Sequence, residues 1–281
     1  MVEKVGVVGC GLMGAGIAEV SARAGKDVVV AESSPMAVAA GLKRLETSLH
    51  RAEERGRITS AAEVLARITV LDSLDALADR DLVVEAIVED EAVKVELFGR
   101  LDAIVTSPDA ILASNTSSIP IMKLAVATKR PSHVLGVHFF NPVPVLSLVE
   151  LVPSLLTAPE TTERARSFVE GDLGKHAIDC QDRAGFVVNA LLIPFILSAI
   201  RMLESGFATA EDIDQGLVQG AAHPQGPLAL ADLIGLDTTK AVAESLYQEF
   251  REQLYAPPPL LARMVEAGLL GRKTGRGFYT Y

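Results

Sequence analysis

A glycine-rich turn near the start of the chain constrains the fold more than any other feature. The turn follows an apolar β-branched run, opens a stretch of helical periodicity and reads Gly9-Cys10-Gly11-Leu12-Met13-Gly14. In such a turn Gly9 permits the tight bend, Gly11 lets the backbone approach a pyrophosphate, and Gly14 allows close packing of helix on strand. The sequence therefore predicts a dinucleotide-binding turn. A glycine turn in a nucleotide-free α/β protein is the alternative.

Glu32 strengthens the dinucleotide interpretation because it stands at the end of the second apolar run. An acidic side chain at this place accepts hydrogen bonds from the ribose hydroxyls of adenosine, whereas a 2′-phosphate would meet a like charge. We therefore expect NAD rather than NADP as the cofactor.

Up to about residue 155, short β-branched runs alternate with longer stretches of helical periodicity. This alternation is typical of a parallel sheet with crossover helices, and the near-continuous apolar runs suit strands covered on both faces. The sequence predicts a Rossmann-type, mostly parallel α/β domain. Its expected strands are Lys4–Val8, Asp27–Ala31, Ile68–Leu71, Leu82–Val88, Ala110–Ala113 and Val134–Phe140.

After Arg183 the strand signal stops and helical periodicity takes over. We therefore expect two domains, a Rossmann domain over residues 1–182 and an all-α domain over residues 183–281. The helical half is too apolar for a domain that stands alone in water. We therefore expect a homodimer built mainly on this half. The expected helices are Phe186–Glu204, Ala210–Gln219, Pro227–Ile234, Thr238–Leu254 and Pro259–Ala267, with Gly206, Gly220, Gly235 and Gly268 at their carboxyl ends.

Composition argues against several classes of partner. The chain has 26 Lys and Arg against 36 Asp and Glu, a net charge of −10, which disfavours nucleic acid. The most apolar stretch, residues 186–200, is shorter than the roughly 20 residues of a membrane span, so we expect no membrane insertion. Cys10 and Cys180 form no Cys-x-x-Cys pair and have no His at ligand spacing, so we expect no metal and a reducing, cytoplasmic location.

The stretch from Leu42 to Ala66 predicts a pair of helices that project from the sheet and break near Gly56. A solvated helix face explains its charges most simply. An electropositive platform for a phosphate-bearing ligand is the alternative. The basic residues are Lys43, Arg44, Arg51, Arg55, Arg57 and Arg67.

Five polar residues, Ser114-Asn115-Thr116-Ser117-Ser118, follow the strand that ends near Ala113. Open α/β sheets bind ligands at the carboxyl ends of their strands. Helix capping by Ser118, ahead of Ile119-Pro120, accounts for one serine but not for all five polar residues.

His138 and Glu150 each interrupt an apolar run, and they are symmetric about residue 144. If the two runs pair as a hairpin that turns near Pro144, these two side chains lie across from each other. A carboxylate beside imidazole fixes the tautomer and stabilises imidazolium, as a general base requires. A lone buried His is more often a structural residue, but the facing Glu favours the catalytic interpretation.

Asn189 is the one strongly polar side chain between Phe186 and Ser198. A buried amide without a hydrogen-bond partner costs about 1–3 kcal/mol, so we expect it to have one. Protein backbone and a ligand group are equally acceptable partners.

These motifs continue into Ala222-His223-Pro224-Gln225-Gly226-Pro227 and Lys273-Thr274-Gly275-Arg276-Gly277-Phe278-Tyr279. In this order, over nearly the whole chain, they resemble the short-chain-length 3-hydroxyacyl-CoA dehydrogenase family, and most closely its bacterial 3-hydroxybutyryl-CoA members. The resemblance implies NAD-linked interconversion of (S)-3-hydroxyacyl-CoA and 3-oxoacyl-CoA, an acyl-CoA partner and a helical dimerisation domain.

The resemblance also implies roles for single residues. His138 is similar to the family's general base and Glu150 to its partner, while Ser117 and Asn189 resemble residues that position the substrate's 3-oxygen. Glu32 replaces the family's usual Asp. The expected cofactor-binding residues are Gly9, Gly11, Leu12, Met13, Gly14, Glu32, Glu89, Lys94, Ser117, Asn141 and Lys273.

Two rival functions use the same sequence features. A sugar-acid dehydrogenase of the same architecture, acting on a substrate such as gulonate, would share the base and the NAD site but need a carboxylate clamp. A non-catalytic NAD-binding or structural protein would not need the set of His138, Glu150, Ser117 and Asn189.

Overall fold

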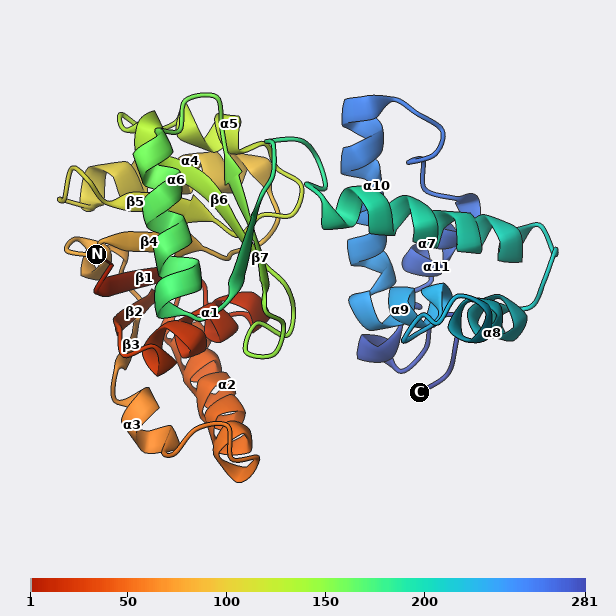
Figure 1. The fold of residues 1–281 in the computed structure, drawn as a ribbon, viewed down its shortest axis with the longest axis horizontal. Helices are drawn as coiled ribbons and strands as arrows, with labels where there is room; N and C mark the ends of the chain where they lie inside the picture. The colour runs from red at the N-terminus through yellow and green to blue at the C-terminus, as the bar shows by residue number, and fades with distance from the viewer. Residues whose placement is uncertain (1) are drawn as a thin grey trace. The chain divides into compact units, whose positions relative to one another are not determined.

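The computed structural model describes residues 2–281 (Figure 1). The chain divides into two compact units, the first ending at Asp182 and the second running Arg183–Tyr281. The fold class is confirmed: a Rossmann-type, mostly parallel sheet is followed by helices only.

An eight-stranded sheet forms the centre of the first unit, in the order β3-β2-β1-β4-β5-β6-β7-β8. From β3 to β6 all neighbours pair in parallel, β7 runs antiparallel to β6, and β8 is parallel to β7. The strands are β1 (Lys4–Val8), β2 (Asp27–Ala31), β3 (Ile68–Leu71), β4 (Leu82–Glu85), β5 (Ile111–Ser114), β6 (Val134–Phe139), β7 (Leu148–Pro153) and β8 (His176–Asp179).

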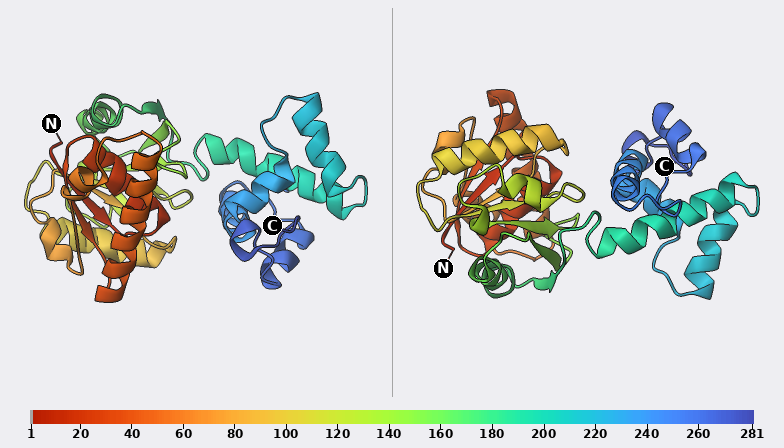
Figure 2. Two further views of the ribbon diagram at one scale, coloured as in Figure 1. Left: turned by 90° about the horizontal axis from the view of Figure 1, so that it is seen from below. Right: turned by 90° about the horizontal axis from the view of Figure 1, so that it is seen from above.

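Helices cover both faces of this sheet (Figure 2). On one face lie α1 (Leu12–Arg23) and α6 (Pro159–Arg166), which continues as a π-helical segment (Ser167–Asp172). On the other lie α4 (Glu91–Ile104) and α5 (Ile121–Ala125). The strands therefore bury apolar side chains on both sides, as their near-continuous apolar sequences predict.

A long helix, α2 (Pro35–Glu54), and the short α3 (Ala61–Leu65) project from the sheet, in line with the expected helix pair. The projection begins earlier than Leu42 because Ser34 caps α2, with its hydroxyl accepting from the Ala37 N–H at 3.3 Å, and Pro35 stands at the first helical position. Gly56, with φ of +65°, lies just after the end of α2, near the expected break between the two helices.

Two strand predictions need correction. The strand expected over Leu82–Val88 ends at Glu85, because the Ile87 N–H donates to the Glu85 carboxylate at 2.8 Å and the chain turns there. The β8 strand, a short edge strand, was not expected at all.

Five helices build the second unit around their own core. Gly206, Gly235 and Gly268 take positive φ at helix ends as expected, whereas Gly220 is still helical and Ala222 takes the positive φ instead. Among residues 2–281, no helix combines the length and apolar character needed to cross a bilayer. The helices are α7 (Val188–Glu204), α8 (Ala210–Gly220), α9 (Pro227–Ile234), α10 (Leu236–Phe250) and α11 (Pro259–Glu266).

Candidate active site

The glycine turn joins β1 to α1 at the carboxyl edge of the sheet. Gly9 has φ of +90°, and a Cβ on Gly14 would stand 1.9 Å from the Gly9 carbonyl oxygen, so both positions require glycine. Around Gly11 the space within 4 Å of a Cβ is empty. The turn therefore leaves its backbone at Gly11 open to a ligand, at the N-terminus of α1.

A cavity of about 770 Å³ opens beside this turn. It is lined by Gly9, Gly11 and Glu32, together with the segment after β4 that includes Ile87 and Val88. The Glu32 carboxylate accepts hydrogen bonds from the N–H groups of Cys10 and Ser33. A helix N-terminus, open glycine backbone and an acidic group at the end of β2 fit the pyrophosphate and adenosine ribose of NAD.

His138 and Glu150 face each other across the β6–β7 pair, as the sequence symmetry predicts. Imidazole Nδ1 lies 2.7 Å from Glu150 Oε2, and both side chains are buried. On the other side of the ring, Nε2 lies 3.0 Å from the Ser117 hydroxyl. Because an ionised carboxylate only accepts, this geometry assigns a proton to Nδ1 and leaves Nε2 to exchange a proton with a group beside Ser117.

The other four polar residues of the predicted cluster hold the loop rather than face His138. Asn115 Oδ1 accepts from the Phe139 N–H at 2.8 Å, and the Ser114 hydroxyl donates to Glu85 at 2.6 Å. Thr116 and Ser118 donate their hydroxyls to Glu89.

Capping by Ser118 is a wrong prediction. The carboxylate of Asp182 accepts from the first N–H groups of α5, those of Ile121 at 2.7 Å and Met122 at 2.8 Å. Asp182 lies far along the sequence, so the local pattern around Ser118 gave no sign of it.

Lys94 and Glu89, two expected cofactor contacts, form an ion-pair cluster with Glu85, in which Lys94 and Glu85 are buried and Glu89 is partly exposed. The Lys94 ammonium, 1% exposed, lies 2.9 Å from Glu85 and 2.7 Å from Glu89. Burial opposes ionisation of Glu89, but the Lys94 charge and the Thr116 and Ser118 hydroxyls outweigh it and hold the pKa of Glu89 below its usual range. Sequence reasoning missed Glu85, whose only signal is an acidic residue inside an apolar strand.

Three further expected site residues belong to other segments of the chain. Asn141 is exposed on the loop after β6. Asn189 and Lys273 belong to the second unit, where Asn189 is half-buried in the first turn of α7 rather than fully buried, and Lys273 pairs with Asp237 at 2.5 Å. Of the predicted catalytic residues, the first unit therefore brings Ser117, His138 and Glu150 together.

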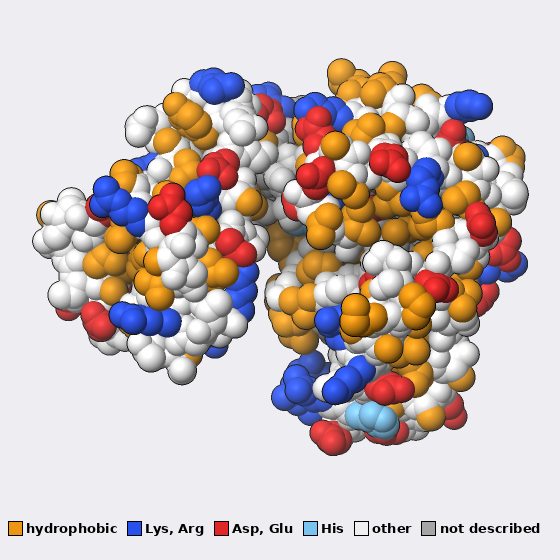
Figure 3. Space-filling model, turned by 180° about the vertical axis from the view of Figure 1, so that it is seen from behind, with side chains coloured by type: hydrophobic (Ala, Val, Ile, Leu, Met, Phe, Trp, Pro, Cys, Tyr) orange, Lys and Arg blue, Asp and Glu red, His pale blue; other side chains and the backbone are white. Residues whose placement is uncertain are grey.

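A second cavity, of about 610 Å³, lies between α1, α2 and the β6–β7 loop. Lys43, Arg44 and Arg51 line it together with Asn141, and Figure 3 shows Lys and Arg side chains gathered over the projection. Arg44 also donates to the carbonyl oxygen of Cys10, which ties α2 to the glycine turn.

Cys10 packs against α2 at Gly41, where a Cβ would stand 2.6 Å from the Cys10 Cβ. Burial, and then the nearby Glu32 charge, raise the pKa of the Cys10 thiol to about 11. Across the described residues 2–281, no group of three metal-ligating side chains comes together.

Fold and site together define an NAD-dependent dehydrogenase. Residues 4–183 match the family model described as 3-hydroxyacyl-CoA dehydrogenase, NAD binding domain, and residues 185–281 match the C-terminal domain of the same family. The chain belongs to the 3-hydroxyacyl-CoA dehydrogenase family.

Relatives match over full length. A 3-hydroxybutyryl-CoA dehydrogenase of Mycobacterium tuberculosis is 58% identical, covering 100% of this chain and 99% of the relative. The human mitochondrial hydroxyacyl-coenzyme A dehydrogenase is 42% identical, covering 100% and 92%. The crystal structure of (S)-3-hydroxybutyryl-CoA dehydrogenase PaaH1 from Ralstonia eutropha superposes with a TM-score of 0.93 at 46% identity, covering 100% and 99%.

Proposed function

We propose that the protein interconverts (S)-3-hydroxybutyryl-CoA and acetoacetyl-CoA with NAD, using His138 as the general base. The observation that carries the proposal is the buried imidazole held between Glu150 and Ser117 at the carboxyl edge of the sheet. The full-length likeness to proteins named 3-hydroxybutyryl-CoA dehydrogenase supports the choice of a short acyl chain.

The proton chemistry follows from the two nitrogens of His138. In the oxidation direction Nε2 accepts the proton of the 3-hydroxyl group, and the Glu150 carboxylate, 2.7 Å from Nδ1, stabilises the imidazolium that forms. In the reverse direction imidazolium returns that proton to the developing alkoxide. Ser117 donates a hydrogen bond to the same oxygen, and one such donor contributes about 3 kcal/mol at most. Asn189 remains a proposed contact of the substrate.

The cofactor supplies a hydride acceptor when bound, and residues of the first unit position it. The glycine turn would hold the pyrophosphate at the N-terminus of α1, and Glu32 the adenosine ribose. Glu89, Lys94, Asn141 and Lys273 remain proposed contacts toward the nicotinamide half. Because the Glu32 carboxylate repels a 2′-phosphate, kcat/KM with NADH should exceed that with NADPH by a large factor, and Glu32→Ala should narrow the gap.

The basic cavity supports a substrate that bears phosphate groups. Lys43, Arg44 and Arg51 place three positive charges at one cavity of a chain whose net charge is −10. A local cluster of this kind attracts a compact anion against the global charge. We assign this cavity to the nucleotide end of coenzyme A.

An apolar surface on the second unit supports the expected homodimer. Val187, Leu191 and Met202 on and beside α7 are 41%, 72% and 41% exposed, and Phe207 after the helix is 79% exposed. Large exposed apolar side chains along a helix are typical of an association surface. Light scattering should give twice the monomer mass of 29.8 kDa, and a monomer would refute this assembly.

Steady-state rates test the function. NADH oxidation is followed with acetoacetyl-CoA, with longer 3-oxoacyl-CoA thioesters and, in the oxidation direction with NAD, with gulonate. We expect acetoacetyl-CoA to give the highest kcat/KM. Faster turnover of gulonate would indicate the sugar-acid dehydrogenase, and no turnover of any substrate would indicate a non-catalytic NAD-binding protein.

A further inference from the structure

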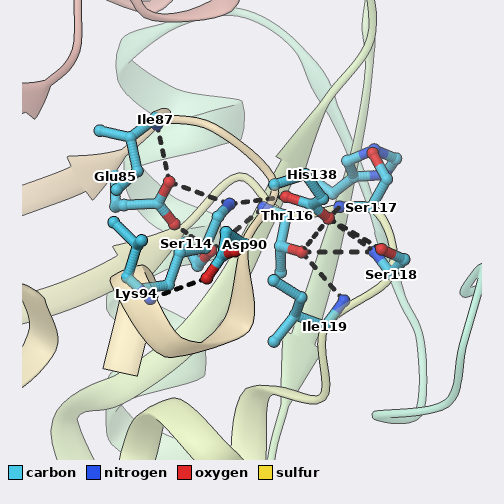
Figure 4. Close-up of polar contacts among 12 residues, drawn as sticks. Glu85, Ile87, Asp90, Lys94, Ser114, Thr116, Ser117, Ser118, Ile119 and His138 are labelled. Atoms are coloured by element: carbon cyan, nitrogen blue, oxygen red, sulfur yellow. Dashed lines mark hydrogen bonds and ion pairs between the residues drawn. The ribbon is translucent and has the colours of Figure 1, made fainter. Parts of the chain in front are cut away.

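Glu85, at the end of β4, is a fully buried carboxylate with three hydrogen-bond donors around it. It accepts from the Ile87 N–H at 2.8 Å, from the Ser114 hydroxyl at 2.6 Å and from the Lys94 ammonium at 2.9 Å. Figure 4 shows these groups side by side with the loop of residues 114–118 and His138. None of the proposed chemical steps uses Glu85.

Two chains of contacts lead from Glu85 to the loop that carries Ser117. The short one passes through the Ser114 hydroxyl, which accepts from the Thr116 N–H at 3.1 Å. The long one passes through Lys94 to Glu89. A single oxygen of Glu89 accepts from the Ser117 N–H at 3.0 Å and the Ser118 N–H at 3.2 Å.

Both chains of contacts end at the part of the loop that carries the Ser117 hydroxyl. Ser117 itself has one side-chain contact of importance to the reaction, the 3.0 Å approach of its hydroxyl to His138 Nε2. Its backbone is held by Glu89, and the residue before it is held by Ser114. The direction of the Ser117 hydroxyl therefore depends on anchors that trace back to one carboxylate.

We propose that Glu85 is a positioning residue, which acts through Ser114 and Lys94 to aim Ser117 at His138. This inference rests on the proposed function, because it assigns Ser117 and His138 to the reaction. The role requires a charged group. Without the charge of Glu85, the buried Lys94 ammonium would lose one of its two carboxylate partners. The charge-assisted hydrogen bond that Ser114 donates to Glu85 would be lost as well.

The arrangement also explains why the anchor is buried rather than exposed. A carboxylate inside the protein, with both of its oxygens bound to fixed donors, cannot rotate into water. The adjacent strands hold it further, since Glu85 pairs in register with Val8 of β1 and Ser114 of β5. Preorganisation of this kind matters because small misplacements of a reacting group cost rate.

A double-mutant cycle tests the proposal. Glu85→Gln keeps the shape of the side chain but removes its charge, and it should lower kcat at saturating NADH on the order of 10-fold. In a Ser117→Ala background the same change should lower kcat less than about 2-fold, because the hydroxyl that Glu85 positions is already absent. A loss of equal size in both backgrounds would overturn the proposal.

Asp102→Asn is the matched control. Asp102 is a nearly buried carboxylate of the same unit that accepts from the Lys129 N–H at 2.9 Å and from the Arg130 guanidinium at 2.7 Å, at the other end of α4. Its loss should lower the melting temperature and leave kcat within about 2-fold of the wild type. If Glu85→Gln does not fold, Ser114→Ala replaces it in the cycle and should show the same dependence on Ser117.

Histidine ring spectra separate failure of this inference from failure of the proposed function. In protein labelled with ¹⁵N-histidine, five histidines contribute, and the His138 signals are assigned by their loss in His138→Gln. Ser117→Ala and Glu85→Gln should shift the His138 Nε2 signal in the same direction, and Asp102→Asn should not move it. An unmoved signal in Glu85→Gln would overturn the positioning role, whatever substrate the enzyme turns over.

Discussion

The two units bury carboxylates for different purposes. In the first unit, Glu85 and Glu150 are fully buried and bind charged or titratable side chains, Lys94 and His138. In the second unit, Asp214 accepts from the N–H groups of Leu228 at 2.8 Å and Ala229 at 2.9 Å and from the Tyr279 hydroxyl at 2.9 Å.

Asp232 follows the second pattern. It accepts from the N–H groups of Phe278 at 3.0 Å and Tyr279 at 2.9 Å and from the Tyr281 hydroxyl at 3.1 Å, so it fixes the path of the last segment of the chain. A carboxylate on main-chain N–H groups stabilises a fold, whereas a carboxylate on a titratable ring can also stabilise a charge that appears during a reaction. The contrast is therefore between Glu85 and Glu150, which hold a lysine and an imidazole, and Asp214 and Asp232, which hold main-chain N–H groups and tyrosine hydroxyls.

The largest expected effect is in the first unit. His138→Gln should lower kcat by about 10² to 10⁴, the usual range for a positioned acid or base. NADH affinity should barely change, because the imidazole is assigned to substrate chemistry. A folded variant with more than about a tenth of wild-type kcat would end the general-base assignment.

Glu150→Gln should have the next largest effect. The amide keeps the contact with Nδ1 but supplies no negative charge, so imidazolium is less stabilised and kcat should fall on the order of 10-fold to 100-fold. The measurement is kcat together with melting temperature on one preparation. Residual activity that falls only in proportion to unfolded protein would assign Glu150 to the scaffold instead.

Asp232→Asn should show the reverse pattern. An amide in place of the carboxylate directs N–H groups at main-chain donors, which should lower the free energy of unfolding by about 1–3 kcal/mol. Urea unfolding measures this loss, and kcat of the folded protein should stay within about 3-fold of the wild type. A large loss of kcat with unchanged stability would erase the contrast between the units.

The smallest expected effect is a loss of stability in acid, which should arise from one ion pair in each unit. Burial opposes ionisation of Glu89 and Asp237, but Lys94 and Lys273 outweigh it and lower both pKa values from the usual 4.5 and 3.8. A carboxyl group whose pKa is lowered in the folded state stabilises the fold at pH values above its ordinary, unfolded-state pKa. This stabilisation is lost as the pH falls through the folded-state pKa.

Glu89→Gln and Asp237→Asn should therefore each lose less stability than the wild type between about pH 5 and pH 3. Urea unfolding at several pH values measures the slopes. Slopes equal to that of the wild type would show that the pairs with Lys94 and Lys273 contribute nothing to folding.

Sequence predicted most of the fold because its strands are short, apolar and punctuated by glycine. The His138–Glu150 pairing was predictable too, since an antiparallel register follows from symmetry about a turn. β8 was missed because a four-residue edge strand with polar ends has almost no periodicity.

The remaining errors concern partners that meet only in three dimensions. Asp182 caps α5 from about 60 positions away, and no local pattern at Ser118 indicates this. Lys94 remains a proposed cofactor contact, and its sequence position gave no sign of the two carboxylates that pair with it. Roles that depend on long-range side-chain contacts require coordinates.

The contact between Cys10 and Gly41 sets a joint limit on side-chain volume at two distant positions. Glycine inside a helix destabilises it by about 0.5–1 kcal/mol relative to alanine, so α2 keeps Gly41 at a cost. The reason is the Cys10 side chain, which leaves only 2.6 Å for a Cβ at position 41. The combined side-chain volume at positions 10 and 41 is therefore limited. Gly41→Ala alone should push α2 away from the glycine turn, whereas Cys10→Gly in the same chain should let the alanine fit.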